Sequence, residues 1–402
     1  GDSRPGGSCD GLDFAGITDV YSTRYAFMAL NKNTGQAQCW GDSVYGGECS
    51  GMNFSGITDL YSTHYAFMAL NMNTGHAHCW GDSYWGGECS LRNFSGITHV
   101  YSTDRAFMAL NKKTGQAQCW GDSVYGGECS GMNFSGITDL YSTHYAFMAL
   151  NMNTGHAHCW GDSYWGGECS LRNFSGITDV YSTRNFFMAL NKNTGQAQCW
   201  GDSGYGGDCL GMDFGGINDV YSSMYAFVAL NKNSGLAQCW GGFSSGGDCL
   251  GMDFAGVTDV YSTKYAFMAL SKNSGLAQCW GDSGSGGDCL GMDFAGVTSV
   301  YSTAFAFTAL NKNSGLGQCW GDAEYGGSCR SIDFAGVTDL YSTMFAFMAL
   351  NKDRGLAQCW GDPGSGGDCH GMDFAGITEV YSTSSAFMAL DENAGRAQCW
   401  SF

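Results

Sequence analysis

The chain has 402 residues, a formal net charge of −19 and 20 cysteines. This acidity argues against nucleic-acid binding through a basic surface. Hydrophobic residues make up 44% of the chain, too many for a disordered protein. No apolar run approaches the length that spans a membrane, so we expect no membrane span.

A unit of forty residues occurs ten times, without insertion or deletion, and fourteen of its positions are identical in all ten copies. Such a strict period is typical of stacked copies of one supersecondary unit. We therefore expect residues 1–402 to form a single repeat array. Its copies are 1–40, 41–80, 81–120, 121–160, 161–200, 201–240, 241–280, 281–320, 321–360 and 361–400.

The second copy shows the elements expected in each unit. Residues 41–47 have the composition of a loop, and 57–63 and 65–71 are two apolar runs rich in β-formers. A turn ending at Gly75 then leads into a third short strand over 76–80. Both connections are short, so each copy is predicted to be an antiparallel three-stranded meander.

The invariant apolar positions indicate how the copies stack. In the second copy they are Phe54, Phe67, Ala69, Leu70 and Trp80. A lone three-stranded sheet cannot bury enough surface to be stable, whereas stacking covers both of its faces. The predicted fold class is therefore all-β, with ten three-stranded blades in a tandem array.

Three segments of the repeat carry a family resemblance: 57–63 (ITDLYST), 66–70 (AFMAL), and 80–83 (WGDS) with the glycines 86–87. The pattern resembles the regulator-of-chromosome-condensation repeat, especially the shorter three-stranded version of a secreted β-lactamase-inhibitor propeller. The resemblance implies one blade of a β-propeller per copy. This chain departs from the family in its ten copies, its two cysteines per copy and its Tyr-Ser-Thr segment. The nucleotide-exchange activity of intracellular members is therefore not carried over.

The number of copies leaves two arrangements open. Most propellers have four to eight blades, so ten blades would close only as a wide ring. The alternative is an open superhelix, in which each blade touches only its neighbours.

The cysteines recur at a regular 30/10 spacing, which predicts disulfides and an oxidising, extracellular compartment. One pairing joins the two cysteines of each copy. The other bridges the short glycine-rich loop between copies and is favoured, because that loop can fold back on its own strand end. It leaves the first and last cysteines to close the array or to link molecules head to tail. The cysteines that distinguish these schemes are Cys9, Cys39, Cys49, Cys79, Cys89, Cys119 and Cys399.

Four copies carry an N-glycosylation sequon, which also favours secretion. The other six have Asp in place of Asn, and none of them has Ser two residues later. Two of the four copies are identical, so the sequons are not independent events. The predicted glycosylation sites are Asn53, Asn93, Asn133 and Asn173.

No segment predicts catalysis. Residues 201–204 (GDSG) resemble a protease nucleophile segment, but the serine is replaced by Ala323 and Pro363 in later copies and no histidine recurs as a base. No Walker loop, zincin helix or dinucleotide fingerprint is present. We expect no enzyme activity and no cofactor.

Two groups of residues have side chains of the kinds that bind metals. His76 and His78 point to one face of a strand, as do their counterparts in the fourth copy, but most other copies have Gln there, as expected of polar surface positions. Asp42 and Glu48 supply only two carboxylates per loop, too few for calcium. We therefore expect no metal site.

The copies differ most at one loop site and at the turn between the first two strands. Because the interior positions are uniform, these variable positions are expected to face solvent, where Tyr and Trp are common in binding surfaces. Neutral drift in loops would give the same pattern. The turn residues include Arg24, His64, Asp104, Arg184, Met224, Lys264 and Met344. The candidate binding residues are Tyr45, Tyr84, Trp85, Tyr125, Tyr164 and Trp165.

Two functions fit these patterns. The first is a secreted, non-catalytic structural protein, the building block of an extracellular fibre, coat or appendage that self-associates head to tail or laterally. The second is a secreted binding module, a lectin-like adhesin or a protein inhibitor, which uses its aromatic loops to bind glycans or extracellular proteins.

Overall fold

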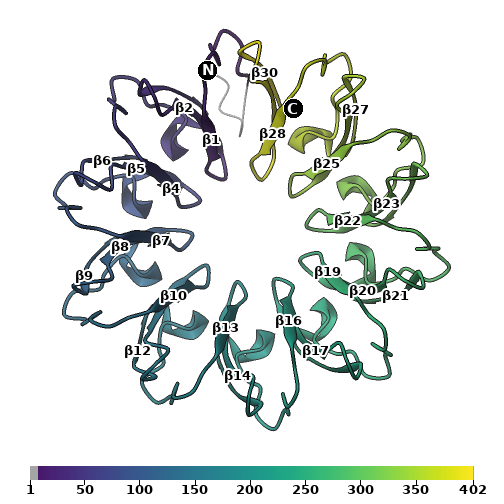
Figure 1. The fold of residues 1–402 in the computed structure, drawn as a ribbon, viewed down its shortest axis with the longest axis horizontal. Helices are drawn as coiled ribbons and strands as arrows, with labels where there is room; N and C mark the ends of the chain where they lie inside the picture. Colours follow the sequence, from purple (N-terminus) through teal and green to yellow (C-terminus); the bar gives the residue numbers. More distant parts are fainter. Residues whose placement is uncertain (1–7, 402) are drawn as a thin grey trace. The chain divides into compact units, whose positions relative to one another are not determined.

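The computed structural model describes residues 8–401, and within this range the chain consists of β-strands, single 3-10 turns and loops, without an α-helix. Each copy forms one antiparallel three-stranded sheet with its strands in sequence order (Figure 1). The predicted all-β tandem array is thus confirmed. None of the helical turns in residues 8–401 is long and apolar enough to cross a membrane.

Every sheet begins with a short, half-buried strand. These first strands are β1 (Asp19–Ser22), β4 (Asp59–Ser62), β7 (His99–Ser102), β10 (Asp139–Ser142), β13 (Asp179–Ser182), β16 (Asp219–Ser222), β19 (Asp259–Ser262), β22 (Ser299–Ser302), β25 (Asp339–Ser342) and β28 (Glu379–Ser382).

The middle strand is the buried one. The middle strands are β2 (Ala26–Asn31), β5 (Ala66–Leu70), β8 (Ala106–Asn111), β11 (Ala146–Leu150), β14 (Phe186–Asn191), β17 (Ala226–Asn231), β20 (Ala266–Ser271), β23 (Ala306–Asn311), β26 (Ala346–Asn351) and β29 (Phe387–Asp391).

The third strand ends each copy. The third strands are β3 (Gln36–Gly41), β6 (Ala77–Gly81), β9 (Gln116–Gly121), β12 (Ala157–Gly161), β15 (Gln196–Gly201), β18 (Leu236–Gly241), β21 (Leu276–Gly281), β24 (Leu316–Gly321), β27 (Leu356–Gly361) and β30 (Arg396–Trp400). Single 3-10 turns follow: η1 (Ser43–Tyr45), η2 (Ser83–Trp85), η3 (Ser123–Tyr125), η4 (Ser163–Trp165), η5 (Ser203–Tyr205), η6 (Phe243–Ser245), η7 (Ser283–Ser285), η8 (Ala323–Tyr325) and η9 (Pro363–Ser365).

The chain divides into two compact units. Unit 1 contains the chain up to Asn191, together with Gln198–Asp202 and Ala394–Cys399. Unit 2 contains Lys192–Ala197, Ser203–Asn393 and the end of the chain from Trp400. Unit 1 thus holds most of the first five copies, and unit 2 most of the last five.

The hairpin between the second and third strands depends on glycine. In the second copy, Phe67 pairs with Trp80 across β5 and β6, and Gly75 in the connecting turn has φ +77°. A Cβ atom on Gly75 would lie 2.5 Å from the backbone nitrogen of Ser95 in the next copy. Glycine is therefore required here both for the turn and for the close approach of the next copy.

The hydrophobic core lies between consecutive sheets. Ala26, Met28 and Leu30 of β2 pack against Phe67 and Trp80 of the next sheet, and all five are buried. A core of the same composition recurs between the following sheets of each unit. Each sheet therefore covers its neighbour, which is how a three-stranded unit becomes stable.

The invariant tryptophan ties its own copy to the loop before it. The Trp80 ring stacks on Phe67, with 5.1 Å between the ring centroids, and meets the edge of Phe54 at 5.4 Å. Its indole Nε1 donates a hydrogen bond to the carbonyl oxygen of Gly46 at 3.1 Å. Trp80 thus satisfies its only polar group while it fills the space between the sheets.

The disulfides follow the scheme that bridges the short loop. Cys39 bonds to Cys49 and Cys79 to Cys89, and bridges with the same separation of ten residues recur along the chain. Within unit 1, Cys9 bonds to Cys399, which joins the first copy covalently to the last. All twenty cysteines lie in the described part of the chain and all are in disulfides.

Candidate functional site: the turn cluster and aromatic ridge of unit 1

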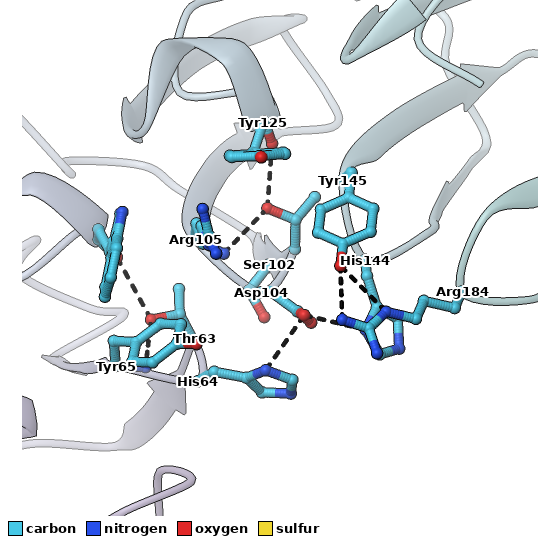
Figure 2. A network of polar contacts seen from close by, with 12 residues as sticks. Thr63, His64, Tyr65, Ser102, Asp104, Arg105, Tyr125, His144, Tyr145 and Arg184 are labelled. Carbon is cyan, nitrogen blue, oxygen red and sulfur yellow. Dashed lines mark hydrogen bonds and ion pairs between the residues drawn. The ribbon is translucent and has the colours of Figure 1, made fainter. Parts of the chain in front are cut away.

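The variable turn between the first and second strands gathers side chains from consecutive copies of unit 1 (Figure 2). We use the name turn cluster for His64, Asp104 and His144, which occupy the same position in three successive copies. The aromatic ridge denotes the neighbouring residues Tyr25, Tyr45, Tyr65, Trp85, Arg105, Tyr125, Tyr145 and Trp165.

Backbone hydrogen bonds place the turns side by side. His64 donates its amide N–H to the carbonyl oxygen of Asp104, and Asp104 donates in the same way to His144, both at 3.0 Å. The hydroxyl of Thr63 accepts the amide N–H groups of Tyr65 and Ala66. Each turn is therefore rigid, and it lies next to the turn of the following copy.

Asp104 is the centre of the turn cluster. Its Oδ2 lies 3.1 Å from Nδ1 of His64 and 2.9 Å from Nδ1 of His144, and its side chain is only 12% exposed. Burial raises the pKa of Asp104, but hydrogen bonds and charge from His144 and His64 outweigh it and hold the pKa well below its usual range. The expectation that this turn residue faces solvent is wrong for Asp104, because the hydrogen-bonded turns bring two imidazole rings over it.

The arrangement leaves specific groups for a ligand. Asp104 engages Nδ1 of both imidazoles, so Nε2 is the ring nitrogen that each can offer to an outside group. The side chains of His64 and His144 are 38% and 34% exposed. The turn cluster can therefore present two hydrogen-bonding imidazoles held at fixed angles by one carboxylate.

The aromatic ridge runs beside the turn cluster. The ring centroids of Tyr25 and Tyr45 are 5.1 Å apart, those of Tyr45 and Tyr65 are 5.2 Å apart, and those of Tyr65 and Trp85 are 4.2 Å apart. Tyr145 continues the ridge further along, with its ring centroid 5.1 Å from that of Tyr125. Successive copies thus build two rows of rings, one ending at Trp85 and the other beginning at Tyr125.

Arg105 lies between these two rows and carries a positive charge. It stands where the copies on both sides have Tyr65 and Tyr145. Its guanidinium carbon lies 4.9 Å from the ring centroid of Trp85 and 4.8 Å from that of Tyr125. Both distances are within the range of a cation–π interaction, so the guanidinium is held between two rings.

The six aromatic residues singled out in the sequence lie in two settings. Tyr84 and Tyr164 project outward, with 62% and 60% of their surface exposed, and the Tyr164 hydroxyl donates to Oδ1 of Asp202 at 3.1 Å. The other four are half-buried within the ridge: Tyr45, Trp85, Tyr125 and Trp165.

Sequence reasoning missed several partners in this site. Tyr65, Arg105, His144 and Tyr145 belong to it, although none was singled out. A signal was available for Arg105, because that position is Tyr or Phe in seven of the ten copies. A charge that replaces a recurring ring marks a specialised copy.

The paired histidines occupy a structural place. His78 Nε2 lies 2.8 Å from the carbonyl oxygen of Asn53 and 3.1 Å from Nε2 of His76. In the first copy, Gln38 makes the equivalent contact with Asp13. Burial and the neighbouring His76 lower the pKa of His78, although the hydrogen bond to Asn53 opposes them. His78 thus takes the place of glutamine in a hydrogen bond that joins the third strand to the loop containing Asn53.

The other loop residues have local roles. Asn53 is exposed, as are the asparagines of the other three sequons, and its side-chain Oδ1 accepts the amide N–H of Ser55 at 3.0 Å. Asp42 caps η1 by accepting the amide N–H of Val44, and Glu48 accepts that of Ser50. Within residues 8–401, no three His, Cys, Asp or Glu side chains gather as metal ligands would.

Comparison with known proteins gives matches at the level of structure alone. No protein-family model matches the chain, and no curated protein does. The ectodomain of the receptor kinase CR4 from Physcomitrella patens is 19% identical, with a TM-score of 0.36, over 67% of this chain and 74% of that one. Prp20p from Saccharomyces cerevisiae is 14% identical, with a TM-score of 0.35, over 69% of this chain and 75% of that one.

One further match is to a protein of the family that the repeat sequence resembles. Yeast RCC1 (Prp20), in its complex with Kap60, is 14% identical to this chain, with a TM-score of 0.32, over 66% of this chain and 70% of that one. These low scores carry no argument about its activity.

Proposed function

We propose that the protein is a secreted, non-catalytic binding protein, and that the turn cluster and aromatic ridge of unit 1 form its recognition surface. The observation that carries this proposal is Arg105, held between Trp85 and Tyr125 next to the buried carboxylate of Asp104. A fixed guanidinium between aromatic faces is typical of binding surfaces, where Arg, Tyr and Trp supply most of the affinity.

The chemistry of this surface favours extracellular glycans or proteins as partners. Aromatic rings offer flat apolar faces, while the imidazoles and the guanidinium offer directional hydrogen bonds. Secretion is supported by the ten disulfides that twenty bonded cysteines make, which persist in oxidising compartments. The four exposed sequons agree with this location.

The test compares wild-type protein with Arg105→Tyr, which restores the residue of the neighbouring copies and so preserves the fold. Lys113→Ala, at an exposed turn position, is the matched control. Each protein is applied to a glycan array and to an array of extracellular proteins. We expect specific partners of the wild type to be retained by the Lys113 variant and lost by the Arg105 variant. The proposal fails if no partner binds, or if the Arg105 variant keeps every partner.

A structural role is a second candidate, favoured by exposed leucines. Leu91 and Leu171 of unit 1 are fully exposed, and Leu210, Leu250 and Leu290 of unit 2 are 93–95% exposed. Apolar side chains presented in this way favour lateral self-association. The alternative in which Cys9 and Cys399 link one molecule to the next is wrong, because these two cysteines bond within one chain.

Electron microscopy and sedimentation at rising protein concentration test this second role. We expect fibres or sheets from the wild type, and fewer from a variant with Leu210, Leu250 and Leu290 changed to Asn. Discrete single molecules at every concentration would rule out the structural role while leaving the binding proposal intact.

A further inference from the structure

One copy of unit 2 lacks a ring that its neighbours have. The last residue of the 3-10 turn is Tyr or Trp in six copies and packs against the aromatic residue that follows the variable turn. Tyr325 shows the usual arrangement: its ring centroid lies 5.0 Å from that of Phe305 and 5.3 Å from that of Phe345. Three rings, from two consecutive copies, thus form a triangle.

In η7 the same position is Ser285. The two flanking rings, Tyr265 and Phe305, remain in place with their centroids 5.6 Å apart. The corresponding distances are 6.0 Å between Phe305 and Phe345 and 5.9 Å between Tyr25 and Tyr65, where the third ring is present. The two flanking rings therefore keep nearly the same separation although the third ring of the triangle is missing.

The missing ring leaves a cavity of about 420 Å³. We call it the Ser285 slot. Its walls include the rings of Tyr265 and Phe305 and the carboxylates of Asp282 and Asp322, with Ser285 at the position of the absent tyrosine. A volume of this size lies within the range of small-molecule sites, and the lining here joins two aromatic rings to two carboxylates.

The slot combines features that the other serine copies lack. Beside Ser245 the first carboxylate is absent, because Gly242 stands in its place. Beside Ser365 the second flanking ring is absent, because Ser385 stands in its place. Among the three serine copies, only Ser285 therefore has two rings and two carboxylates.

Charge indicates what the slot would accept. The Oδ2 of Asp282 accepts a hydrogen bond from the Ser285 hydroxyl at 2.6 Å, and Oδ1 of Asp322 accepts the amide N–H of Glu324 at 2.9 Å. A carboxylate can accept several hydrogen bonds, so both keep acceptor capacity for a ligand. Lys264 does not line the slot, although its Nζ lies 6.0 Å from the Phe305 ring centroid. The charged groups that line the slot are thus the two carboxylates.

The pKa of the tyrosine at the equivalent position in the second copy responds to the corresponding two carboxylates. Burial raises the pKa of Tyr45, and the charges of Asp42 and Asp82 raise it further. These two residues are the counterparts of Asp282 and Asp322. Both carboxylates therefore act on the hydroxyl end of the ring, where they disfavour a negative group and favour a positive one.

We propose that the Ser285 slot binds an arylalkylammonium cation, a protonated aliphatic amine that carries an aromatic ring. The aromatic ring of the ligand takes the place of the missing tyrosine against Tyr265 and Phe305. Its ammonium group lies near Asp282 and Asp322, at the end of the slot where tyrosine-bearing copies have the hydroxyl. Cation–π attraction and charge pairing then act together, because the same rings and carboxylates surround the ligand. The slot belongs to unit 2, so this proposal does not depend on the recognition surface of unit 1.

The test is a titration of the intact, disulfide-bonded protein with benzylammonium at neutral pH, by calorimetry and saturation-transfer NMR. We expect one site per chain, and binding at least roughly tenfold weaker for uncharged benzyl alcohol, since the charge interaction is lost. Methyl glucoside, a sugar of similar size, is expected not to bind. Equal binding of benzyl alcohol, or binding of the glucoside alone, would overturn the proposal.

Variants locate the site. Ser285→Tyr restores the ring that six other copies carry, so it preserves the fold while it fills the slot, and we expect roughly a tenfold or greater loss of benzylammonium affinity. Asp322→Asn is expected to weaken binding through loss of charge. Glu324→Gln removes a neighbouring charge outside the slot and is expected to bind as the wild type does. Unchanged binding in the Ser285 variant would show that the slot is not the site.

Discussion

The bridge between Cys9 and Cys399 is expected to stabilise the protein more than any short bridge. A disulfide stabilises mainly by restricting the unfolded chain, and the effect grows with the logarithm of the loop it closes. Cys9 and Cys399 are 390 residues apart, whereas Cys79 and Cys89 are 10 apart. The chain-entropy relation gives about 6 kcal/mol for the long loop and about 3 kcal/mol for the short one.

The comparison uses two double variants, Cys9→Ser/Cys399→Ser and Cys79→Ser/Cys89→Ser, so that no unpaired thiol is left. Guanidinium unfolding without reductant, followed by the near-ultraviolet circular dichroism of the buried tryptophans, measures the free energy of unfolding of each protein. We expect the long-bridge variant to lose about twice as much stability as the short-bridge variant. Equal losses, or a larger loss from the short bridge, would refute the entropic reasoning.

Three further predictions concern glycine packing and pH. Gly86→Ala is expected to cost about 3 kcal/mol, because φ is +109° and the new Cβ would lie 2.7 Å from the buried ring of Phe107. Gly51→Ala, where φ is +78° and the space is open, is expected to cost only about 1 kcal/mol, with both variants measured by guanidinium unfolding. Asp104 has a depressed pKa in the folded state, so its contribution is present above about pH 4 and lost as pH falls through the folded pKa. The difference in free energy of unfolding between wild type and Asp104→Asn should therefore shrink as the pH falls below about 4. A constant difference would contradict an ionised Asp104 in the folded state. His78 also has a lowered pKa when folded. The unfolded state therefore binds more protons near and below about pH 6.5, and the free energy of unfolding decreases as the pH is lowered. His78→Gln should reduce this decrease in the free energy of unfolding between about pH 7 and pH 5. An unchanged pH profile would argue against the contact between His78 and Asn53.

Much of the fold could be predicted from one copy. The strands expected over 57–63, 65–71 and 76–80 contain β4, β5 and most of β6, because runs of β-forming residues and turn glycines are local properties of the chain. The invariant Phe67 and Trp80 are buried between sheets, as a repeating unit requires. The array follows from repetition, since identical units can bury their faces only on each other.

The candidate site could not be predicted from any single copy. Asp104 and His144 are forty residues apart in the chain and meet because the backbone N–H of Asp104 donates to the carbonyl oxygen of His144 in the next turn. A polar side chain in a turn reads as solvent-facing, and only its neighbours in the folded molecule determine its burial. Arg105 likewise acquires its role from rings supplied by two other segments.

The residue sequence therefore specified the repeating sheet, the stacking of copies and the regular placement of the cysteines, because these follow from patterns within forty residues. The tertiary structure selected the cysteine partners, which in the case of Cys9 and Cys399 lie at opposite ends of the chain. It also determined which variable residues meet. The Ser285 slot illustrates the physical reason: a serine in one copy becomes a cavity only because rings and carboxylates from adjacent copies surround it.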